Sequence, residues 1–340
     1  MNPASKWMSR SYLATFCASH FRWDGCVSEG VLYLERDSMN KISCVVAASA
    51  AVAVSTLAQA NVVNNWNLIV LNNLQNNSQD IEGRAWVGGN FTSSGAPTTA
   101  KNLTPSGNYS GITTLAVVGN VSVSNLNHQS GNLRYGGTFS GNFNANGGGN
   151  RAQDASLAGQ VATFTNDLNG LSQFYTTLTT NSTASYPSGQ PAAVVYNANP
   201  SNGLAVFNVS AANVFNNNLI QEMKLNVNGA SAIVINVSGT SVNFNNGNMT
   251  GAWTSAFARA NVIWNFFEAT TISLDRNFNG ALLAPKAHLT NTTAIDGSVF
   301  VKSFNQSGEV HLPNFNGFIP APGSLALLAA AGVITGRRRR

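Results

Sequence analysis

The chain has 340 residues, of which 44% are hydrophobic and only 9% are charged, whereas about 25% charged residues is typical. Residues 61–319 hold nine Lys and Arg and nine Asp and Glu, so the formal net charge of +5 comes from the two ends of the chain. This neutral body argues against nucleic acid as a partner, because nucleic-acid binding needs a basic surface.

A secretory signal peptide is predicted for residues 39–60. A polar start is followed by the apolar run Val45–Leu57 and then by a small-x-small site that contains Ala58 and Ala60. These are the three parts of a secretory signal, and the apolar run is too short to span a membrane. We expect signal peptidase to cleave between Ala60 and Asn61.

Residues 1–38 precede this signal and are interpreted as a non-native N-terminal extension, with translation beginning at Met39. The alternative is an extended polar start of the signal itself. The cysteines Cys17, Cys26 and Cys44 all lie before the expected cleavage point. The mature chain would then have no disulfide, no cysteine-bound zinc and no cysteine nucleophile.

Short strands separated by Asn, Gly and Ser turns are expected in residues 61–150. A unit of apolar residues, Gly-Asn and apolar residues occurs at Gly89-Asn90 and recurs at Gly119-Asn120 and at Gly141-Asn142. Weak repetition of short strands at this spacing favours a β-solenoid. Asparagine is very abundant in the mature body, and stacked asparagines are expected to hydrogen-bond from coil to coil.

One long helix is predicted at about residues 151–180, with Asn150 as its N-cap. Seven apolar residues recur there at spacings of three and four, which is the period of one helix face. They are Leu157, Val161, Phe164, Leu168, Leu171, Phe174 and Leu178. We expect this face to pack along the β body.

Further strands are predicted between residues 181 and 312. The strand candidates are Ala192–Tyr196, Leu204–Val209, Ala232–Val237, Ser241–Phe244, Val262–Trp264, Thr271–Leu274, Gly280–Ala284, Ala287–Leu289, Gly297–Val301 and Glu309–Leu312. Two similar segments begin at Gly280 and Gly297, and the step between them suits one solenoid coil made of a few short strands.

The body, residues 61–317, resembles the choice-of-anchor A family of exported bacterial surface domains. The likeness rests on DIEGRAWVGGNF (Asp80–Phe91), on GALLAPKAHLTNTTAIDGSVFVKSFNQSGEVH (Gly280–His311) and on the opening segment Trp66–Leu71. The C-terminal half also resembles the solenoids of ice-binding-like proteins and adhesins. The resemblance implies a mainly β, discontinuous parallel β-solenoid with one long accessory helix, and it supplies no catalytic residues.

The C-terminal segment, residues 318–340, resembles a PEP-CTERM sorting signal. A Pro320-Ala321-Pro322-Gly323 motif precedes the apolar run at residues 324–336, and Arg337, Arg338, Arg339 and Arg340 follow. Ala321 stands where the named motif has Glu. The resemblance implies cleavage near Pro320–Pro322 by an exosortase-type enzyme, whereas a plain membrane anchor held by the four arginines is the alternative.

Candidate chemical groups are few and scattered. His128, His288 and His311 lack metal-binding spacing and are interpreted as surface or turn residues. Asp80, Glu82 and Arg84 share one strand face, and a solvated pair beside a neutralising arginine is favoured over a charged site. Asp275, Arg276, Lys286 and Asp296 fall on neighbouring coils without forming the carboxylate pair that sugar cleavage needs.

Aromatic and threonine residues offer two binding alternatives. Trp86, Trp253 and Trp264 are expected in the core rather than against a sugar. Ice binding would use a regular threonine face, but the threonine spacing is irregular. The candidates are Thr270, Thr271, Thr290, Thr292 and Thr293.

The preferred function is therefore a non-enzymatic surface or matrix component that acts in adhesion or assembly. It would be located in the cell envelope or outside the cell, with extracellular polysaccharide among its expected partners and no cofactor. A polysaccharide-acting β-helix enzyme and an ice- or surface-binding module are the alternatives. Converging charged side chains in a groove would favour the enzyme, and an uncharged face would favour binding.

Both processing signals predict the mass of the mature protein. Intact mass spectrometry after fractionation of the native host should find a species that begins at Asn61 and ends between Pro320 and Gly323, outside the inner membrane. A species that retains Arg337–Arg340 in the inner membrane would contradict exosortase-type processing.

Overall fold

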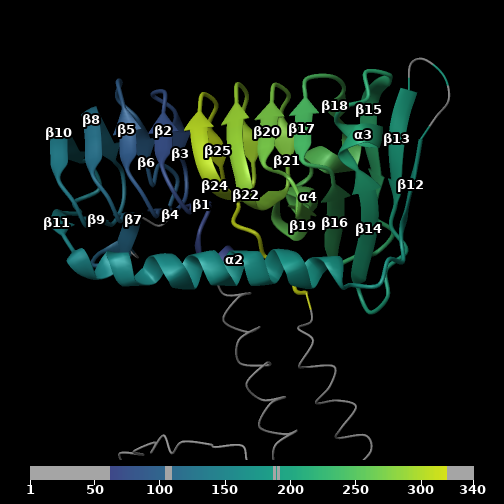
Figure 1. The fold of residues 1–340 in the computed structure, drawn as a ribbon, viewed down its shortest axis with the longest axis horizontal. Coiled ribbons are helices and arrows are strands. Elements are labelled where there is room, and N and C mark those ends of the chain that lie inside the picture. The colour runs from purple at the N-terminus through teal and green to yellow at the C-terminus, as the bar shows by residue number, and fades with distance from the viewer. Residues whose placement is uncertain (1–61, 104–108, 187–188, 190–191, 320–340) are drawn as a thin grey trace, which may run out of the picture. The chain divides into compact units, whose positions relative to one another are not determined.

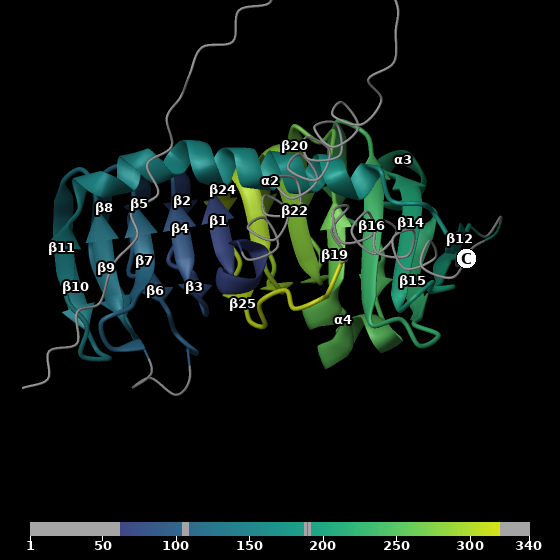
Figure 2. The ribbon, with the colours of Figure 1, turned by 90° about the horizontal axis from the view of Figure 1, so that it is seen from below.

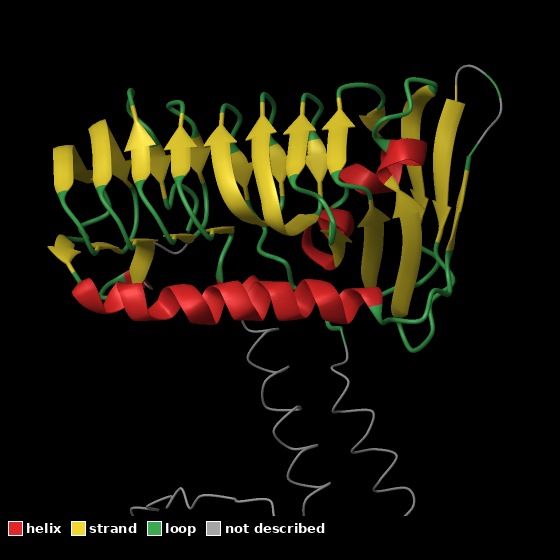
Figure 3. Cartoon of the chain, viewed as in Figure 1, coloured by secondary structure: helices red, strands yellow, loops and turns green. Residues whose placement is uncertain are grey.

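The computed structural model describes residues 62–103, 109–186, 189 and 192–319, and short strands dominate this part of the chain. Twenty-one of the described strands belong to one sheet that is paired in parallel from coil to coil. Figure 1 shows the strands stacked as successive rungs, and Figure 3 shows the long helix α2 (Val161–Thr176) running beneath them. The predicted mainly β parallel solenoid with one long helix is confirmed.

The rungs do not follow one another continuously along the chain. β1 (Leu68–Val70) lies in the middle of the stack, and the next rungs wind from it toward one end (Figure 1). α2 then passes along the body to the other end, from which the later rungs return. β24 (Val299–Gln306) pairs in parallel with β1, so the two halves meet at a seam between these strands. This is the discontinuous solenoid that the resemblance implied.

Each complete rung contributes strands to three faces. The face that α2 covers is called the helix face. Its strands are β11 (Arg151–Gln153), β9 (Asn132–Tyr135), β7 (Thr113–Val117), β4 (Ala85–Val87), β1, the first part of β24, the first part of β22 (Ala281–Asn291), β19 (Val262–Asn265), β16 (Ala232–Ser238) and β14 (Leu204–Ser210).

The second face is called the polar face. Its strands are β10 (Phe139–Ala145), the first part of β8 (Val121–His128), β5 (Phe91–Ser93), β2 (Leu74–Asn76), the last parts of β24 and β22, β20 (Thr271–Leu274) and β17 (Ser241–Phe244).

The third face is built from short strands. They are β6 (Thr98–Thr99), which pairs with the end of β8, β3 (Asp80–Ile81), β25 (Val310–His311), β23 (Ile295–Asp296) and β21 (Phe278–Asn279).

A separate four-stranded sheet lies at the end of the stack that α2 reaches. Its strands are β12 (Thr183–Ser185), β13 (Ala192–Asn197), β15 (Ile220–Asn226) and β18 (Asn248–Met249). The shorter helices are the 3₁₀ segments η2 (Ala155–Gln160) and η3 (Gly251–Thr254) and the α-helices α3 (Ala211–Val214) and α4 (Ala256–Asn261).

The apolar stripe of α2 packs on the helix face, as predicted. Leu168 and Leu171 are buried against sheet residues such as Ile263 and Phe300, and the ring of Phe164 stacks on Trp86 with centroids 4.3 Å apart. Burying one such aliphatic side chain contributes roughly 1.5–3 kcal/mol. The helix is therefore held by a continuous apolar contact that spans rungs of both halves (Figure 2).

Two buried asparagines also bind α2 to the sheet. The Nδ2 of Asn265 donates to the carbonyl of Ser172 at 2.8 Å and to Oδ1 of Asn236 at 2.8 Å. The Nδ2 of Asn236 in turn donates to the carbonyl of Tyr175 at 2.9 Å. The carbonyl of Tyr175 also accepts the backbone N–H of Leu178 at 3.3 Å, so the amide of Asn236 is a second donor to it. The hydrogen bonds satisfy the two buried amides themselves and link the last turns of α2 to the sheet.

The helix begins later than the sequence predicts, at Val161 rather than at residue 151. Residues 151–153 form the strand β11, which pairs in parallel with β9. Asn150 is not an N-cap, because a strand follows it and its Oδ1 accepts from Arg134 at 2.8 Å; Asp154 caps η2 instead. A terminal rung can use residues that also suit a helix because the neighbouring strand supplies their hydrogen-bond partners.

The coil spacing is confirmed in one half and corrected in the other. Leu282 pairs with Val299, so the segments that begin at Gly280 and Gly297 form adjacent coils, as predicted. In the first half, Gly119 lies one rung beyond Gly89 as expected, but the next rung places Gly137, not Gly141, beside Gly119. Thr138 takes the position of the asparagine there, and its backbone N–H donates to Oδ1 of Asn120 at 2.8 Å.

Within the described ranges, no helix is both long and apolar enough to cross a membrane.

Removing packing beneath α2 should destabilise the whole fold. Leu168 is fully buried, so Leu168→Ala should lower the free energy of unfolding by about 2–5 kcal/mol. Leu219 is 51% exposed, so Leu219→Ala, the matched control, should change it by less than about 0.5 kcal/mol. Urea denaturation of both variants measures the difference, and equal effects would show that α2 is not packed as described.

Candidate binding face

The polar face is one of the two faces that α2 does not cover. The strands that form it alternate buried apolar residues with exposed polar ones, so one side chain in two points outward. Phe91, Leu74 and Phe304, for example, are buried between outward-facing polar neighbours. The face is thus held from inside by the apolar core and presents hydrogen-bonding groups outside.

A row of eight outward residues runs across the polar face in register. It is called the central rank and consists of Ser140, Ser122, Thr92, Gln75, Asn305, Thr290, Ser273 and Asn243. All eight are uncharged hydroxyl or amide side chains. Seven strand spacings of about 4.8 Å give the rank a length of roughly 33 Å.

A second row of outward polar residues lies beside the central rank. In the C-terminal half it follows the register Ser241, Thr271, His288 and Ser303. In the N-terminal half it consists of the asparagine ladder Asn73, Asn90 and Asn120, which ends at Thr138.

The asparagine ladder fixes the orientation of its amide groups. Oδ1 of Asn73 accepts the backbone N–H of Asn90 at 2.9 Å, and Oδ1 of Asn90 accepts that of Asn120 at 2.8 Å. A backbone N–H only donates, so the accepting atom of each side chain must be the oxygen. Each Nδ2 group is therefore left as an outward donor.

A hollow of about 490 Å³ lies on the polar face where it crosses the seam. Its lining comes from four neighbouring strands and the turns before them, and includes Asn73, Gln75, Asn90, His288 and Asn305. None of the residues that line it carries a permanent charge.

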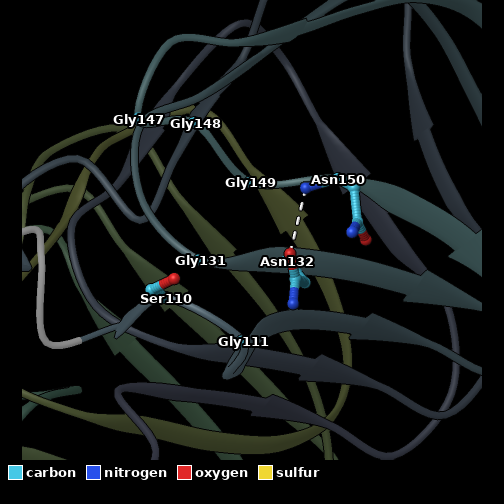
Figure 4. Close-up of a pocket in the computed structure, with 8 residues that line it drawn as sticks. All are labelled: Ser110, Gly111, Gly131, Asn132, Gly147, Gly148, Gly149 and Asn150. Carbon is cyan, nitrogen blue, oxygen red and sulfur yellow. Dashed lines mark hydrogen bonds between the residues drawn. The ribbon is translucent and has the colours of Figure 1, made fainter.

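A second hollow, of about 250 Å³, lies at the glycine-rich end of the first half (Figure 4). A Cβ at Gly149 would lie 1.6 Å from the carbonyl oxygen of Gly131, so the backbones there approach more closely than any side chain permits. Oδ1 of Asn132 accepts the backbone N–H of Asn150 at 3.0 Å (Figure 4). Close backbone packing accounts for the glycines, and this hollow offers little chemistry.

The threonines do not form the regular array that ice binding would favour. Thr271 stands beside His288, and Thr290 stands between Ser273 and Asn305. Thr292 donates to Asp275 at 2.9 Å, and Thr270 donates to the carbonyl of Thr240 at 3.1 Å. Threonine thus occurs in different rows, mixed with asparagine and serine.

The three histidines occupy three different environments. His288 lies on the polar face, with Nδ1 2.8 Å from Oγ of Ser303. His311 lies on the third face, where its ring donates to Asp296 at 2.8 Å and to Glu309 at 2.7 Å. Burial lowers the pKa of His311, but these two hydrogen bonds and the negative charges of Glu82 and Asp296 together outweigh it and raise the pKa above its usual value.

The prediction that His128 is a surface or turn residue is wrong. His128 is fully buried, between the hydroxyls of Thr99 at 2.8 Å and Thr114 at 3.0 Å. Thr114 donates its own proton to the carbonyl of Ser130, so it accepts from Nε2 of the ring. Two hydroxyls therefore hold the neutral imidazole, and burial lowers its pKa to about 4.

The first group of charged candidates separates in the structure. Asp80 pairs with Lys101, and Glu82 accepts the backbone N–H of Leu312 at 2.8 Å. Arg84 lies over the ring of Trp66 at 4.3 Å and donates to the carbonyl of Thr113. The expected neutralising role belongs to Lys101 rather than to Arg84.

The second group is also dispersed. Arg276 and Lys286 each donate to a backbone carbonyl, and Asp275 accepts from a threonine. Asp296 lies apart from them, 3.5 Å from Arg259. The described residues contain no cluster of three or more His, Cys, Asp or Glu that would hold a metal ion. Trp86, Trp253 and Trp264 are fully buried, as predicted.

The predicted processing residues lie outside the described part of the chain. They are Ala58, Ala60 and Asn61 at the signal cleavage site, Pro320, Ala321, Pro322 and Gly323 in the sorting motif, and Arg337, Arg338, Arg339 and Arg340 at the end. The apolar run at 324–336 and the N-terminal segment 1–38 lie outside it as well.

Comparison with known proteins defines the family of this domain. A family model described as "Putative Ice-binding-like adhesive domain" matches residues 59–312. The chain belongs to this family. The match extends from the first described rung to the closing strand β25, so the ice-binding-like adhesive domain and the solenoid coincide.

Two solved structures are similar to the chain. One is an ice-binding protein from an Antarctic bacterium, Flavobacteriaceae, with 15% identity over 80% of this chain and 86% of that one and a TM-score of 0.31. The other is an ice-binding protein from the Antarctic ascomycete Antarctomyces psychrotrophicus, with 14% identity over 74% of this chain and 96% of that one and a TM-score of 0.25. No curated protein matches the chain.

Most residues of the polar face carry no recognisable sequence pattern. The Gly-Asn pairs before Phe91 and Val121 were a usable signal, because they mark Asn90 and Asn120 in the ladder. Gln75 and Asn305 carry no motif and are neighbours only because β2 pairs with β24.

The buried histidine predicts a specific pH dependence of stability. The pKa of His128 falls from 6.5 to about 4 on folding, so the unfolded state binds the proton first. Stability should therefore fall by about 3 kcal/mol as the pH drops from about 6.5 to about 4, and level off below that. His128→Gln should lack this loss.

Urea unfolding of both proteins between pH 4 and pH 7 measures the effect as a difference, which removes the contribution of His311. Parallel pH profiles for the two proteins would show that His128 is not buried in its neutral form.

Proposed function

We propose that this chain is an exported, non-catalytic adhesive domain that binds an extended hydroxyl-bearing surface through its polar face. Extracellular polysaccharide is the expected partner. The observation that carries the proposal is the central rank, in which eight uncharged polar side chains from both halves of the solenoid lie in register. Membership in an ice-binding-like adhesive family supports a role in adhesion.

The chemistry of the rank suits many weak contacts rather than one deep site. Each hydroxyl or amide contributes only about 0.5–1.5 kcal/mol when it exchanges water for a ligand oxygen. Contacts repeated along a rigid face act together, because the first contact raises the effective concentration of the others. Such a face needs a repetitive partner, and polysaccharides provide regularly spaced hydroxyls.

Ice is the second candidate, favoured by the even strand spacing along the face. The mixed composition of the rank argues for a polymer instead, because Thr290 stands between Ser273 and Asn305 rather than in a row of threonines. The enzyme alternative receives less support, because Asp275 and Lys286 make separate contacts and Asp296 is already held in ion pairs with Arg259 and His311.

An adhesive role places the mature domain in the cell envelope or outside the cell. We retain signal peptidase as the enzyme that acts at Ala60 and an exosortase-type enzyme as the one that reads Pro320–Gly323. In this proposal the C-terminal segment anchors the protein at least transiently in the inner membrane, and the choice-of-anchor A resemblance is consistent with alternative anchoring signals.

A bulky cation in the central rank should block adhesion. Ser122 is exposed in the rank, so Ser122→Arg should reduce adsorption of the full-length protein to insoluble polysaccharide particles by about tenfold, equivalent to about 1.4 kcal/mol. Thr163→Arg, on the exposed side of α2, is the control and should change adsorption by less than about twofold.

Cellulose, chitin and agarose particles and polycrystalline ice would each be tested with both variants. Adsorption to ice alone, sensitive to Ser122→Arg, would favour the ice-binding candidate. Equal adsorption by the wild type and both variants on every material would overturn the role of the polar face.

A further inference from the structure

We propose that the hollow on the polar face is a subsite for a single strand of a neutral polysaccharide, which runs along the solenoid axis across the seam. This inference rests on the proposed function and names the part of the face that recognises one polymer chain. The hollow of about 490 Å³ extends over β5, β2, β24 and β22. Its volume lies within the range of about 300–1,000 Å³ that is usual for ligand sites.

The lining supplies oriented donors for ligand oxygens. Oδ1 of both Asn73 and Asn90 is committed to a backbone N–H of the next rung, so Nδ2 is the amide group that each offers to a ligand. In the described part of the chain, no group accepts a hydrogen bond from either Nδ2. Hydroxyl and ring oxygens of a sugar are the complementary acceptors.

The ladder also holds these donors at a fixed spacing. Each asparagine binds the rung beside it, so the amides repeat at the strand spacing of about 4.8 Å. This distance is close to the length of one sugar unit in an extended glycan. Because the donors are held before the ligand arrives, binding requires little additional ordering of side chains.

The lining selects against charged polymers. Amide-bearing Asn73, Gln75 and Asn305 and hydroxyl-bearing Thr92 and Ser303 dominate it, and no Lys, Arg, Asp or Glu is among the lining residues. A carboxylate placed there would lose hydration without gaining a cation. The lining also lacks the pair of carboxylates that glycosidic cleavage uses, so the subsite would bind without cleaving.

The position of the hollow favours a flexible polymer over a crystal surface as the ligand. The hollow interrupts the middle of the central rank, at Gln75 and Asn305. A rigid crystal plane would touch only the residues that rise around the hollow, whereas a single polymer strand can enter it. The seam thus gives the polar face a recognition element that a uniform solenoid would lack.

An isosteric substitution tests this inference. Asn90→Asp keeps an oxygen that accepts the N–H of Asn120 but replaces the donor group with a second acceptor. Asn166→Asp makes the same change on the exposed side of α2, away from the polar face, and is the matched control. Full-length protein would be titrated by calorimetry and NMR with cellohexaose, chitohexaose and maltohexaose, and with an oligoguluronate as the acidic probe.

We expect at least one neutral hexasaccharide to bind with little dependence on salt. Asn90→Asp should weaken that binding by about tenfold, the effect of one lost hydrogen bond and one unsatisfied acceptor, and Asn166→Asp should change it by less than about twofold. Both variants should keep the wild-type melting temperature. Absence of binding to every neutral probe, salt-dependent binding of oligoguluronate alone, or equal weakening by both variants would overturn the inference.

Different experimental results would contradict the subsite and the proposed adhesive function of the whole polar face. If particle adsorption remains sensitive to Ser122→Arg while no soluble hexasaccharide binds, the adhesive face stands and the subsite does not. If a hexasaccharide binds in an Asn90-dependent manner while Ser122→Arg leaves adsorption unchanged, the subsite stands and the extended face does not.

Discussion

The parallel pairing of β24 with β1 and β2 is the constraint on which the rest of the structure depends. It joins the beginning of the described body to its end, and three buried amide side chains complete it. Asn76 donates to Gln306 at 2.9 Å, Gln306 donates to the carbonyl of Asp80 at 3.1 Å, and Asn67 donates to the carbonyl of His311 at 2.9 Å. A change of register between the two rungs would separate these hydrogen-bonded pairs and leave several buried polar groups unsatisfied. Because unpaired buried amides cost free energy, such a shift is unfavourable. The seam therefore fixes the register of both halves and with it the continuity of the polar face.

Asparagine side chains make many of the polar contacts in this domain that charged side chains make in other proteins. An amide both donates and accepts, so it can satisfy the backbone of one rung and the side chain of the next without the desolvation cost of an ion. The pair Asn236 and Asn265 applies this inside the protein, where it binds α2, and Asn73 and Asn90 apply it on the surface. The same chemistry that keeps a charge-poor body ordered thus leaves oriented donors on one face.

The parts of the fold that could be predicted are those in which one local pattern decides the outcome. The stripe from Leu157 to Leu178 predicts an amphipathic helix on its own, and the repeated segment at Gly280 and Gly297 predicts a coil. The strand at 151–153 and the burial of His128 depend instead on neighbours supplied by other rungs. The Gly141-Asn142 pair was misleading for the same reason, since Gly137 has the backbone position that packs on Gly119.

The candidate site was harder to predict than the fold, and the reason lies in how a solenoid builds a surface. Each rung places a single outward residue in the central rank, so no stretch of sequence contains more than one neighbour along it. Thr92 and Ser122 are separated in the chain by β6 and β7, whereas Gln75 and Asn305 belong to different halves of the solenoid. A binding face of this kind is specified by register rather than by motif. A substitution that shifts the seam should therefore alter the face far from the changed residue, while a substitution in one rung alters a single position in the rank.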